Sequence, residues 1–164
     1  MNVKDALRNN LLLTRNLLTQ ALSDLSDADL LVRPVPGANH IAWQLGHVVN
    51  SERGMISKNV PNQAYPELPA GFAERHNKES ATSQDTKGWG TKAEYLALFN
   101  KVRDTTIAAL DRIPETDLDK PVEGPAARMA PTVGALFALA SNHALMHTGQ
   151  FSVVRRKLTK PILM

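Results

Sequence analysis

The sequence predicts an all-α protein, a four-helix bundle with a long crossover loop between its second and third helices. Apolar residues recur every three or four positions in four long segments, as they do along the buried side of a helix. Connectors rich in proline and glycine separate these segments, and no stretch shows the alternation typical of a half-buried strand. With 164 residues, the chain is expected to form a single domain over residues 1–164.

The first helix is expected over residues 3–23, where leucines follow helical spacing. The connector 24–38 contains two prolines and a glycine, which cannot continue a helix. Asn39 is a favourable N-cap residue and is expected to begin the second helix, which would run to residue 59, before Pro61. The apolar face of this helix is formed by Ile41, Leu45, Val48, Val49, Met55 and Ile56.

Two residues of the second helix stand out against this apolar face. Gly46 would let another backbone or helix approach closely, because it has no side chain. Glu52 is the only carboxylate on the apolar face. We expect it either to extend to solvent from the rim of the face or to hydrogen-bond a histidine that binds a metal.

Residues 60–90 are expected to form the crossover, because they show no sustained period and contain several prolines and glycines. A short helix is expected around residues 70–77. A loop of this length usually crosses a bundle from end to end and often acts as a lid. Its aromatic residues, Tyr65, Phe72 and Trp89, would shield a pocket.

The third helix is expected to begin at a capping box formed by Thr91 and Glu94 and to end before Pro114. Residues 115–130 are again irregular. Pro131 is expected to be the first residue of the last helix, since its fixed backbone angle and missing N–H suit that position. The last helix would continue to about Leu158.

Composition excludes several classes of function. The chain has no cysteine, which excludes disulfides, cysteine metal sites and a thiol nucleophile from the protein itself. The net charge of +3 is small and no basic stripe is interleaved with aromatic residues, so no nucleic-acid partner is expected. No apolar run is long enough to span a membrane and the N-terminus lacks the apolar core of a secretion signal, so a cytoplasmic location without a membrane partner is expected.

His143 and His147 are the most informative pair, because residues four apart project from one face of a helix. The face is otherwise apolar, so the two imidazoles either find separate hydrogen-bond partners in the core or bind a metal together. His47 lies beside the apolar face of the second helix and could meet them as a third ligand. His40 lies too far along the axis to share an ion with His47, and we expect it to line the mouth or to be exposed; His76, in a polar run, is expected to face solvent.

Two motifs together resemble the DinB-like metal-dependent superfamily, which includes YfiT-type proteins, bacillithiol transferases and mycothiol-dependent maleylpyruvate isomerases. They are Trp-Gln-Leu-Gly-His, ending at His47 and preceded by Pro-x-Pro-Gly, and His-x-x-x-His-x-Gly-Gln, over residues 143–150. The resemblance implies a four-helix bundle, usually a homodimer, with one divalent metal held by three histidines, here His47, His143 and His147. Many members carry an acidic residue after the first histidine of the late motif, where this chain has Ala144.

Three imidazoles leave an open position on a bound ion, as in catalytic sites, and zinc, nickel or iron(II) would accept them. Because the chain lacks cysteine, our leading hypothesis is metal-dependent transfer of a low-molecular-weight thiol to a small electrophilic substrate. One alternative is a metal-dependent hydrolase with Glu52 as general base. The other is a non-catalytic, stress-related metal-binding bundle. Gln150, one turn after His147, would orient a ligand or pack against a neighbour.

Overall fold

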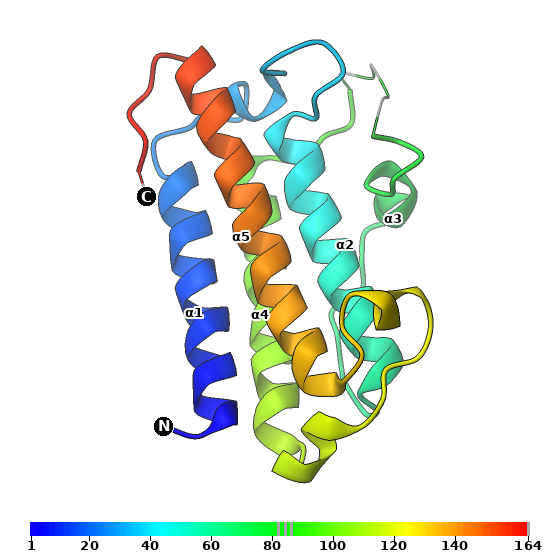
Figure 1. Cartoon of the computed structure of the whole chain (residues 1–164). Helices are drawn as coiled ribbons and strands as arrows, with labels where there is room; N and C mark the ends of the chain where they lie inside the picture. The colour runs from blue at the N-terminus through cyan, green and yellow to red at the C-terminus, as the bar shows by residue number, and fades with distance from the viewer. Residues whose placement is uncertain (82, 84, 86, 164) are drawn as a thin grey trace.

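The computed structural model describes residues 1–81, 83, 85 and 87–163. Four long helices form the bundle: α1 (Val3–Leu22), α2 (Ile41–Asn59), α4 (Lys92–Arg112) and α5 (Val133–Lys157). The short helix α3 (Phe72–Arg75) lies in the crossover between α2 and α4, outside the bundle (Figure 1). The described residues contain no β-strand, only an isolated bridge between Pro121 and Thr132. The predicted all-α four-helix architecture is therefore confirmed.

The direction of the helices explains the length of the crossover. α2 and α4 both run downward in Figure 1, whereas α1 and α5 run upward. The chain after α2 must therefore return along the whole bundle before α4 can begin. Around the bundle, α5 packs against both α1 and α2, and α4 packs against the same two helices. The two helices that carry His47, His143 and His147 are thus neighbours.

The helix ends agree with the sequence prediction at α4 and differ by one or two residues at α2 and α5. The capping box of Thr91 and Glu94 opens α4 as predicted. At α2, His40 rather than Asn39 is the N-cap, because its Nδ1 accepts a hydrogen bond from the backbone N–H of Trp43 at 3.1 Å. At α5, Thr132 is the N-cap and Pro131 precedes the helix, where its carbonyl accepts a hydrogen bond from the Val122 N–H.

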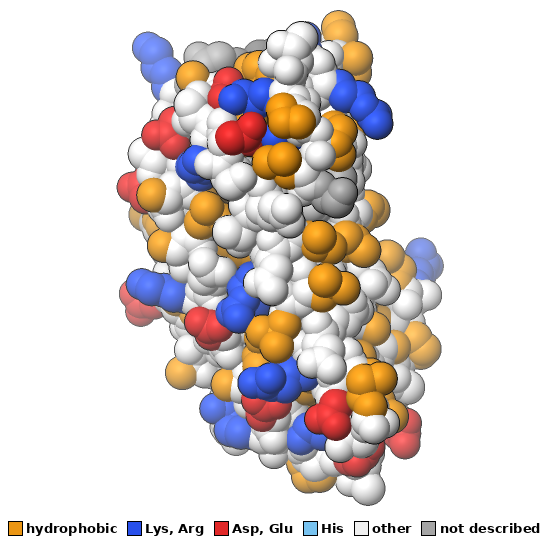
Figure 2. Space-filling model, turned by 90° about the vertical axis from the view of Figure 1, so that its left-hand side faces the viewer, with side chains coloured by type: hydrophobic (Ala, Val, Ile, Leu, Met, Phe, Trp, Pro, Cys, Tyr) orange, Lys and Arg blue, Asp and Glu red, His pale blue; other side chains and the backbone are white. Residues whose placement is uncertain are grey.

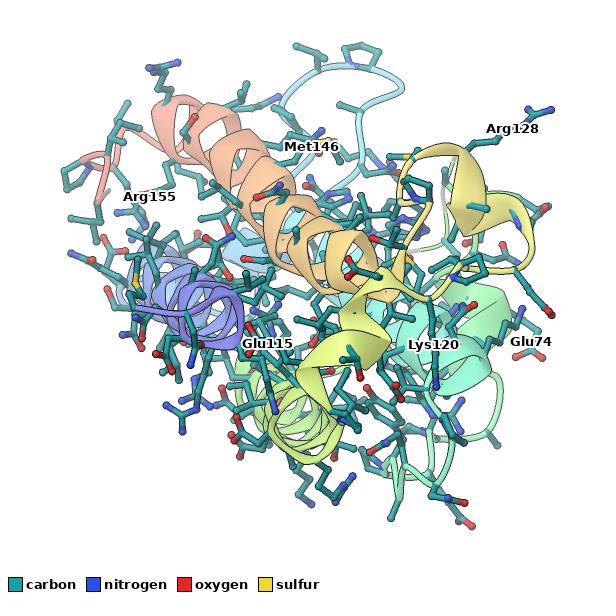
Figure 3. All side chains as sticks on the ribbon, turned by 60° about the horizontal axis from the view of Figure 1, so that its bottom comes forward. Glu74, Glu115, Lys120, Arg128, Met146 and Arg155 are labelled. Atoms are coloured by element: carbon teal, nitrogen blue, oxygen red, sulfur yellow. The ribbon has the colours of Figure 1, made fainter. Side chains whose placement is uncertain are left out.

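Charged side chains of both signs are interspersed on the face of the molecule shown in Figure 2. None of the helices built from described residues combines the length and apolarity that crossing a membrane requires. The basic end of α5 is partly structural. Arg155 lies between α5 and α1 (Figure 3), where its guanidinium pairs with the carboxylate of Asp24 at 2.6 Å.

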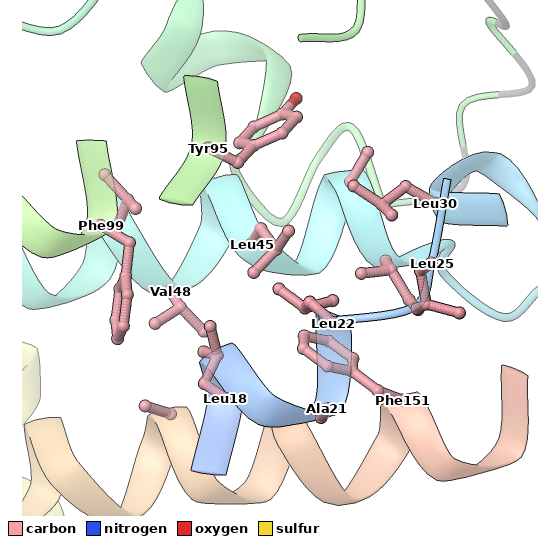
Figure 4. Close-up of a cluster of buried hydrophobic side chains, with 14 of the residues drawn as sticks. Leu18, Ala21, Leu22, Leu25, Leu30, Leu45, Val48, Tyr95, Phe99 and Phe151 are labelled. Atoms are coloured by element: carbon pink, nitrogen blue, oxygen red, sulfur yellow. The ribbon is translucent and has the colours of Figure 1, made fainter. Parts of the chain in front are cut away.

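The core consists of apolar side chains from all four long helices. One cluster, around Leu18, Leu45, Phe99 and Phe151, fills the half of the bundle where α2 begins (Figure 4). A second cluster, which includes Phe137, fills the other half. Fully burying a side chain of this size stabilises the fold by about 1.5–3 kcal/mol. The histidines of interest lie on helices whose positions this packing fixes.

One buried polar cluster lies within the core, and it corrects the prediction for Glu52. The side chain of Glu52 is 1% exposed and forms an ion pair with Arg103 of α4 at 2.8 Å. Arg103 also donates hydrogen bonds to the Leu11 carbonyl and the Thr14 hydroxyl of α1. Glu52 therefore does not extend to solvent, and its carboxylate hydrogen-bonds an arginine rather than a histidine.

Candidate metal centre

The structure brings His47 of α2 together with His143 and His147 of α5. One ring nitrogen from each lies within 4.8 Å of the others. The Nε2 atoms of His143 and His147 are 3.2 Å apart. The ring centroid of His47 is 5.2 Å from that of His143 and 5.4 Å from that of His147. No cysteine, aspartate or glutamate joins this group among the residues that the structure describes.

His147 is oriented by Gln44, the second residue of the Trp-Gln-Leu-Gly-His motif. The sequence pattern alone gives no role to this glutamine. The amide NH₂ of Gln44 donates to the Asn39 carbonyl at 3.0 Å, so its oxygen faces His147. That oxygen accepts a hydrogen bond from Nδ1–H of His147 at 3.1 Å. The proton on Nδ1 leaves the lone pair of Nε2 directed at the other two histidines, which is the tautomer that a metal ligand requires.

His47 is held in a similar way by the crossover. Its Nδ1–H donates to the backbone carbonyl of His76 at 3.0 Å, which leaves Nε2 unprotonated. The ring of Trp43 stacks on the ring of His47 at 4.7 Å with an interplanar angle of 9°. The indole N–H of Trp43 in turn donates to the Ser80 hydroxyl at 3.0 Å. Two contacts from the segment 76–80 therefore fix His47 and the ring beside it.

His76 corrects the sequence prediction, because it is 1% exposed instead of facing solvent. Its Nδ1–H donates to the Phe72 carbonyl at 2.8 Å, and its Nε2 accepts from the Tyr95 hydroxyl at 2.9 Å. The ring occupies the space left by the missing side chain of Gly46. A Cβ at Gly46 would lie 2.1 Å from Cδ2 of His76. The sequence predicts a close approach at Gly46 for a backbone or helix; the group found there is the side chain of His76.

His40 is also buried, with 3% of its surface exposed, so the alternative that it is exposed is wrong. It caps α2, and its ring meets that of Trp89 edge-on at 4.4 Å. Burial is the main cause that lowers the pKa of His40 to about 4. His40 does not join the cluster of three histidines.

The three clustered imidazoles are neutral at pH 7. Burial, with the neighbouring charges of His143 and His47, lowers the pKa of His147 to about 3. Burial, with His47 and Lys78, lowers the pKa of His143 to about 4. Burial also lowers the pKa of His47, against the hydrogen bond to the His76 carbonyl. Neutral imidazole is the form that binds a metal.

The other residues singled out in the sequence supply no ligand atom to the cluster. Gln150 is exposed, one turn beyond His147, and its side chain opposes the fall in the pKa of His147. Ala144 occupies the position where many members of the superfamily carry an acid, and its side chain is fully buried in the core. Glu52 is bound to Arg103.

The aromatic residues of the crossover contact His76 and α4. Phe72 and Trp89 contact His76, with ring centroids 4.2 and 5.4 Å away. Tyr65 hydrogen-bonds the Thr106 hydroxyl of α4 at 2.9 Å. A cavity of about 450 Å³ lies on this side of His76, lined by Phe72, Tyr95 and Leu98 among others. His76 is one of the residues that line this cavity.

The fold and the cluster define a class of protein: an all-α bundle in which two neighbouring helices present three neutral histidines to one point. The chain belongs to the DinB superfamily, whose family model matches residues 10–151. No curated protein matches it significantly.

Two solved structures share the fold. A conserved protein of Enterococcus faecalis aligns with a TM-score of 0.71 and 18% identity, over 98% of this chain and 99% of that chain. YfiT from Bacillus subtilis, described as a probable metal-dependent hydrolase with an unusual four-helix bundle topology, aligns with a TM-score of 0.67 and 16% identity. That alignment covers 96% of this chain and 89% of that chain.

Proposed function

We propose that His47, His143 and His147 bind one divalent transition metal, namely zinc, nickel or iron(II), and that the protein is a metal-dependent enzyme. The observation that carries the proposal is the convergence of three ring nitrogens within 4.8 Å. Gln44 and the His76 carbonyl hold two of these rings in the ligating tautomer. Nitrogen ligands of this kind suit all three metals.

The chemistry that we propose is transfer of a low-molecular-weight thiol to a small electrophile. When bound, the metal would lower the pKa of a thiol or water toward neutrality. The chain has no cysteine, so the sulfur must come from a small molecule. The three histidines would hold the reaction centre, while Trp43, stacked on His47, would exclude water from one side of it.

A direct test uses monochlorobimane as electrophile and mercaptoethanol as thiol. The sulfur displaces chloride from carbon: a C–S bond forms, the C–Cl bond breaks, and the thiol proton passes to solvent. Protein loaded with the right metal should accelerate this reaction, and the His143→Ala variant should not. Equal rates with wild-type protein and buffer, for zinc, nickel and iron(II) alike, would overturn thiol transfer.

Hydrolysis is the second candidate, supported by the structural likeness to YfiT and its description as a hydrolase. Such a reaction needs a base to take a proton from water. The sequence candidate for that base, Glu52, is bound to Arg103, and no carboxylate joins the three histidines in the described part of the chain. Thiol transfer is therefore favoured. Turnover of ester or amide substrates by metal-loaded protein without any thiol would reverse this preference.

A further inference from the structure

Lys78 lies in the turn formed by residues 76–80, which hydrogen-bonds residues of the histidine site at both of its ends. On one side of it, the carbonyl of His76 accepts the hydrogen bond from His47. On the other side, the hydroxyl of Ser80 accepts the indole N–H of Trp43, whose ring stacks on His47. The turn is closed by a hydrogen bond from the Ser80 backbone N–H to the Asn77 side chain at 2.9 Å. The position of Lys78 next to the cluster is therefore fixed by the backbone.

The side chain of Lys78 is exposed, and no ion pair holds its ammonium group within residues 1–81, 83, 85 and 87–163. By contrast, the nearby Arg75 pairs with Asp85, donates to the Lys87 carbonyl and lies over the ring of Trp89. Lys78 is thus the cation of this turn that remains available to a ligand.

The ammonium group of Lys78 puts a positive charge on this turn, which hydrogen-bonds His47 and Trp43 of α2. No carboxylate joins the cluster of three histidines in the described part of the chain. Adding a divalent ion to three neutral imidazoles would make the site more positive still, and such a site attracts an anion.

We propose that Lys78 binds the anionic group, a carboxylate in the simplest case, of a small molecule whose reacting atom is held at the three-histidine site. The substrate or thiol of this protein is then a small organic anion. This assignment rests on the metal site proposed above and deepens it, because Lys78 selects among molecules that reach the same metal.

The experiment compares two thiols that differ in charge. Nickel-loaded protein is titrated with mercaptopropionate and with mercaptoethanol, and binding is followed through the thiolate-to-nickel absorption. Wild-type protein should bind mercaptopropionate about two- to fivefold more tightly than its Lys78→Met variant does, as expected for one exposed ion pair. Mercaptoethanol should bind both proteins equally, and added salt should remove the advantage of the wild type.

Two further variants serve as controls. Lys78→Arg should keep the preference, since it keeps the charge. Lys87→Met removes a charge from the same crossover, beside Asp85, and should keep the preference too.

The outcomes separate the two proposals. Failure to load any metal would overturn the proposed function. Loading of metal with equal affinity for mercaptopropionate in wild-type and Lys78→Met proteins would overturn the role of Lys78 alone. If nickel binds but neither thiol does, thiol transfer is abandoned. The binding of glutarate, which has two carboxylates, is then compared with that of butyrate, which has one. No preference of the wild type for glutarate would then overturn the role of Lys78.

Discussion

Two polar clusters of the bundle, the buried one around Arg103 and the partly buried one of three histidines, differ in how their polar groups are paired. In the first, Arg103 directs four N–H groups at Glu52, the Leu11 carbonyl and the Thr14 hydroxyl, at 2.8–2.9 Å. In the second, the Nε2 atoms of His143 and His147 face each other at 3.2 Å, beside His47 and without a carboxylate in the described cluster. Because opposite charges are balanced in the first cluster, it holds helices together. The second presents lone pairs to one point, which is the arrangement of a ligand-binding site.

The largest expected effect comes from breaking the first cluster. Glu52→Ala would leave the guanidinium of Arg103 buried without its counter-charge, so the free energy of unfolding should fall by about 3–5 kcal/mol. Urea denaturation of the metal-free protein measures this change. The metal content of the folded fraction should stay the same. A loss of metal with unchanged stability would mean that Glu52 serves the histidines after all.

The next effect concerns the contact that holds His47. Gly46→Ala would place a methyl group against the ring of His76 and displace the carbonyl that orients His47. Metal affinity should fall about 10- to 100-fold, as for other residues that orient a ligand. Gly54→Ala, on the same helix, is the matched control, because no atom lies within 4 Å of the added methyl. Equal affinity in both variants, measured by competition with a chelator, would contradict the role of His76.

A smaller effect is expected at Gln44. Gln44→Leu would remove the oxygen that accepts the Nδ1 proton of His147, so metal affinity should fall about tenfold. Gln44→Glu keeps an acceptor at this position and should retain more of the affinity. The same chelator competition measures both variants. If both bind metal like the wild type, the tautomer of His147 is set by other contacts.

The last effect concerns a change of conditions instead of a substitution, namely the pH dependence of stability. The pKa values of His40, His76 and His143 are about 4 and that of His147 is about 3 in the folded chain, against about 6.5 when unfolded. The unfolded state therefore takes up protons first as the pH falls. Stability of the metal-free protein should be greatest above pH 6.5 and decline toward pH 4. Thermal unfolding at several pH values measures this, and a melting temperature that is constant between pH 7 and 5 would contradict it.

The sequence predicted the helices well because each carried its own local signal. The apolar spacing and the capping box of Thr91 and Glu94 act within a few residues, so they need no knowledge of the rest of the chain. The need for a crossover also followed from the length of the segment between α2 and α4. The ends of α2 and α5 shifted because a histidine cap and a threonine cap outcompeted the residues expected from propensity.

The partners of the site residues were harder to predict, because they depend on contacts between distant segments. His76 lies in a run of polar residues, and its burial depends on the space above Gly46, thirty positions earlier. The glycine was the available signal, but it did not say what would fill the space. Glu52 lay on an apolar face, which indicated burial, yet its partner Arg103 comes from another helix and could not be deduced from periodicity.

The most direct test of the central claim is metal content by elemental analysis, on protein prepared without a polyhistidine tag. After incubation with zinc, nickel and iron(II), the wild type should retain about one transition metal per chain, and His143→Ala should retain none. His40→Asn removes a different buried histidine but keeps a favourable helix cap, so it should retain the metal. Wild-type protein that stays empty with all three metals would contradict the account and make the three histidines ordinary residues of the core.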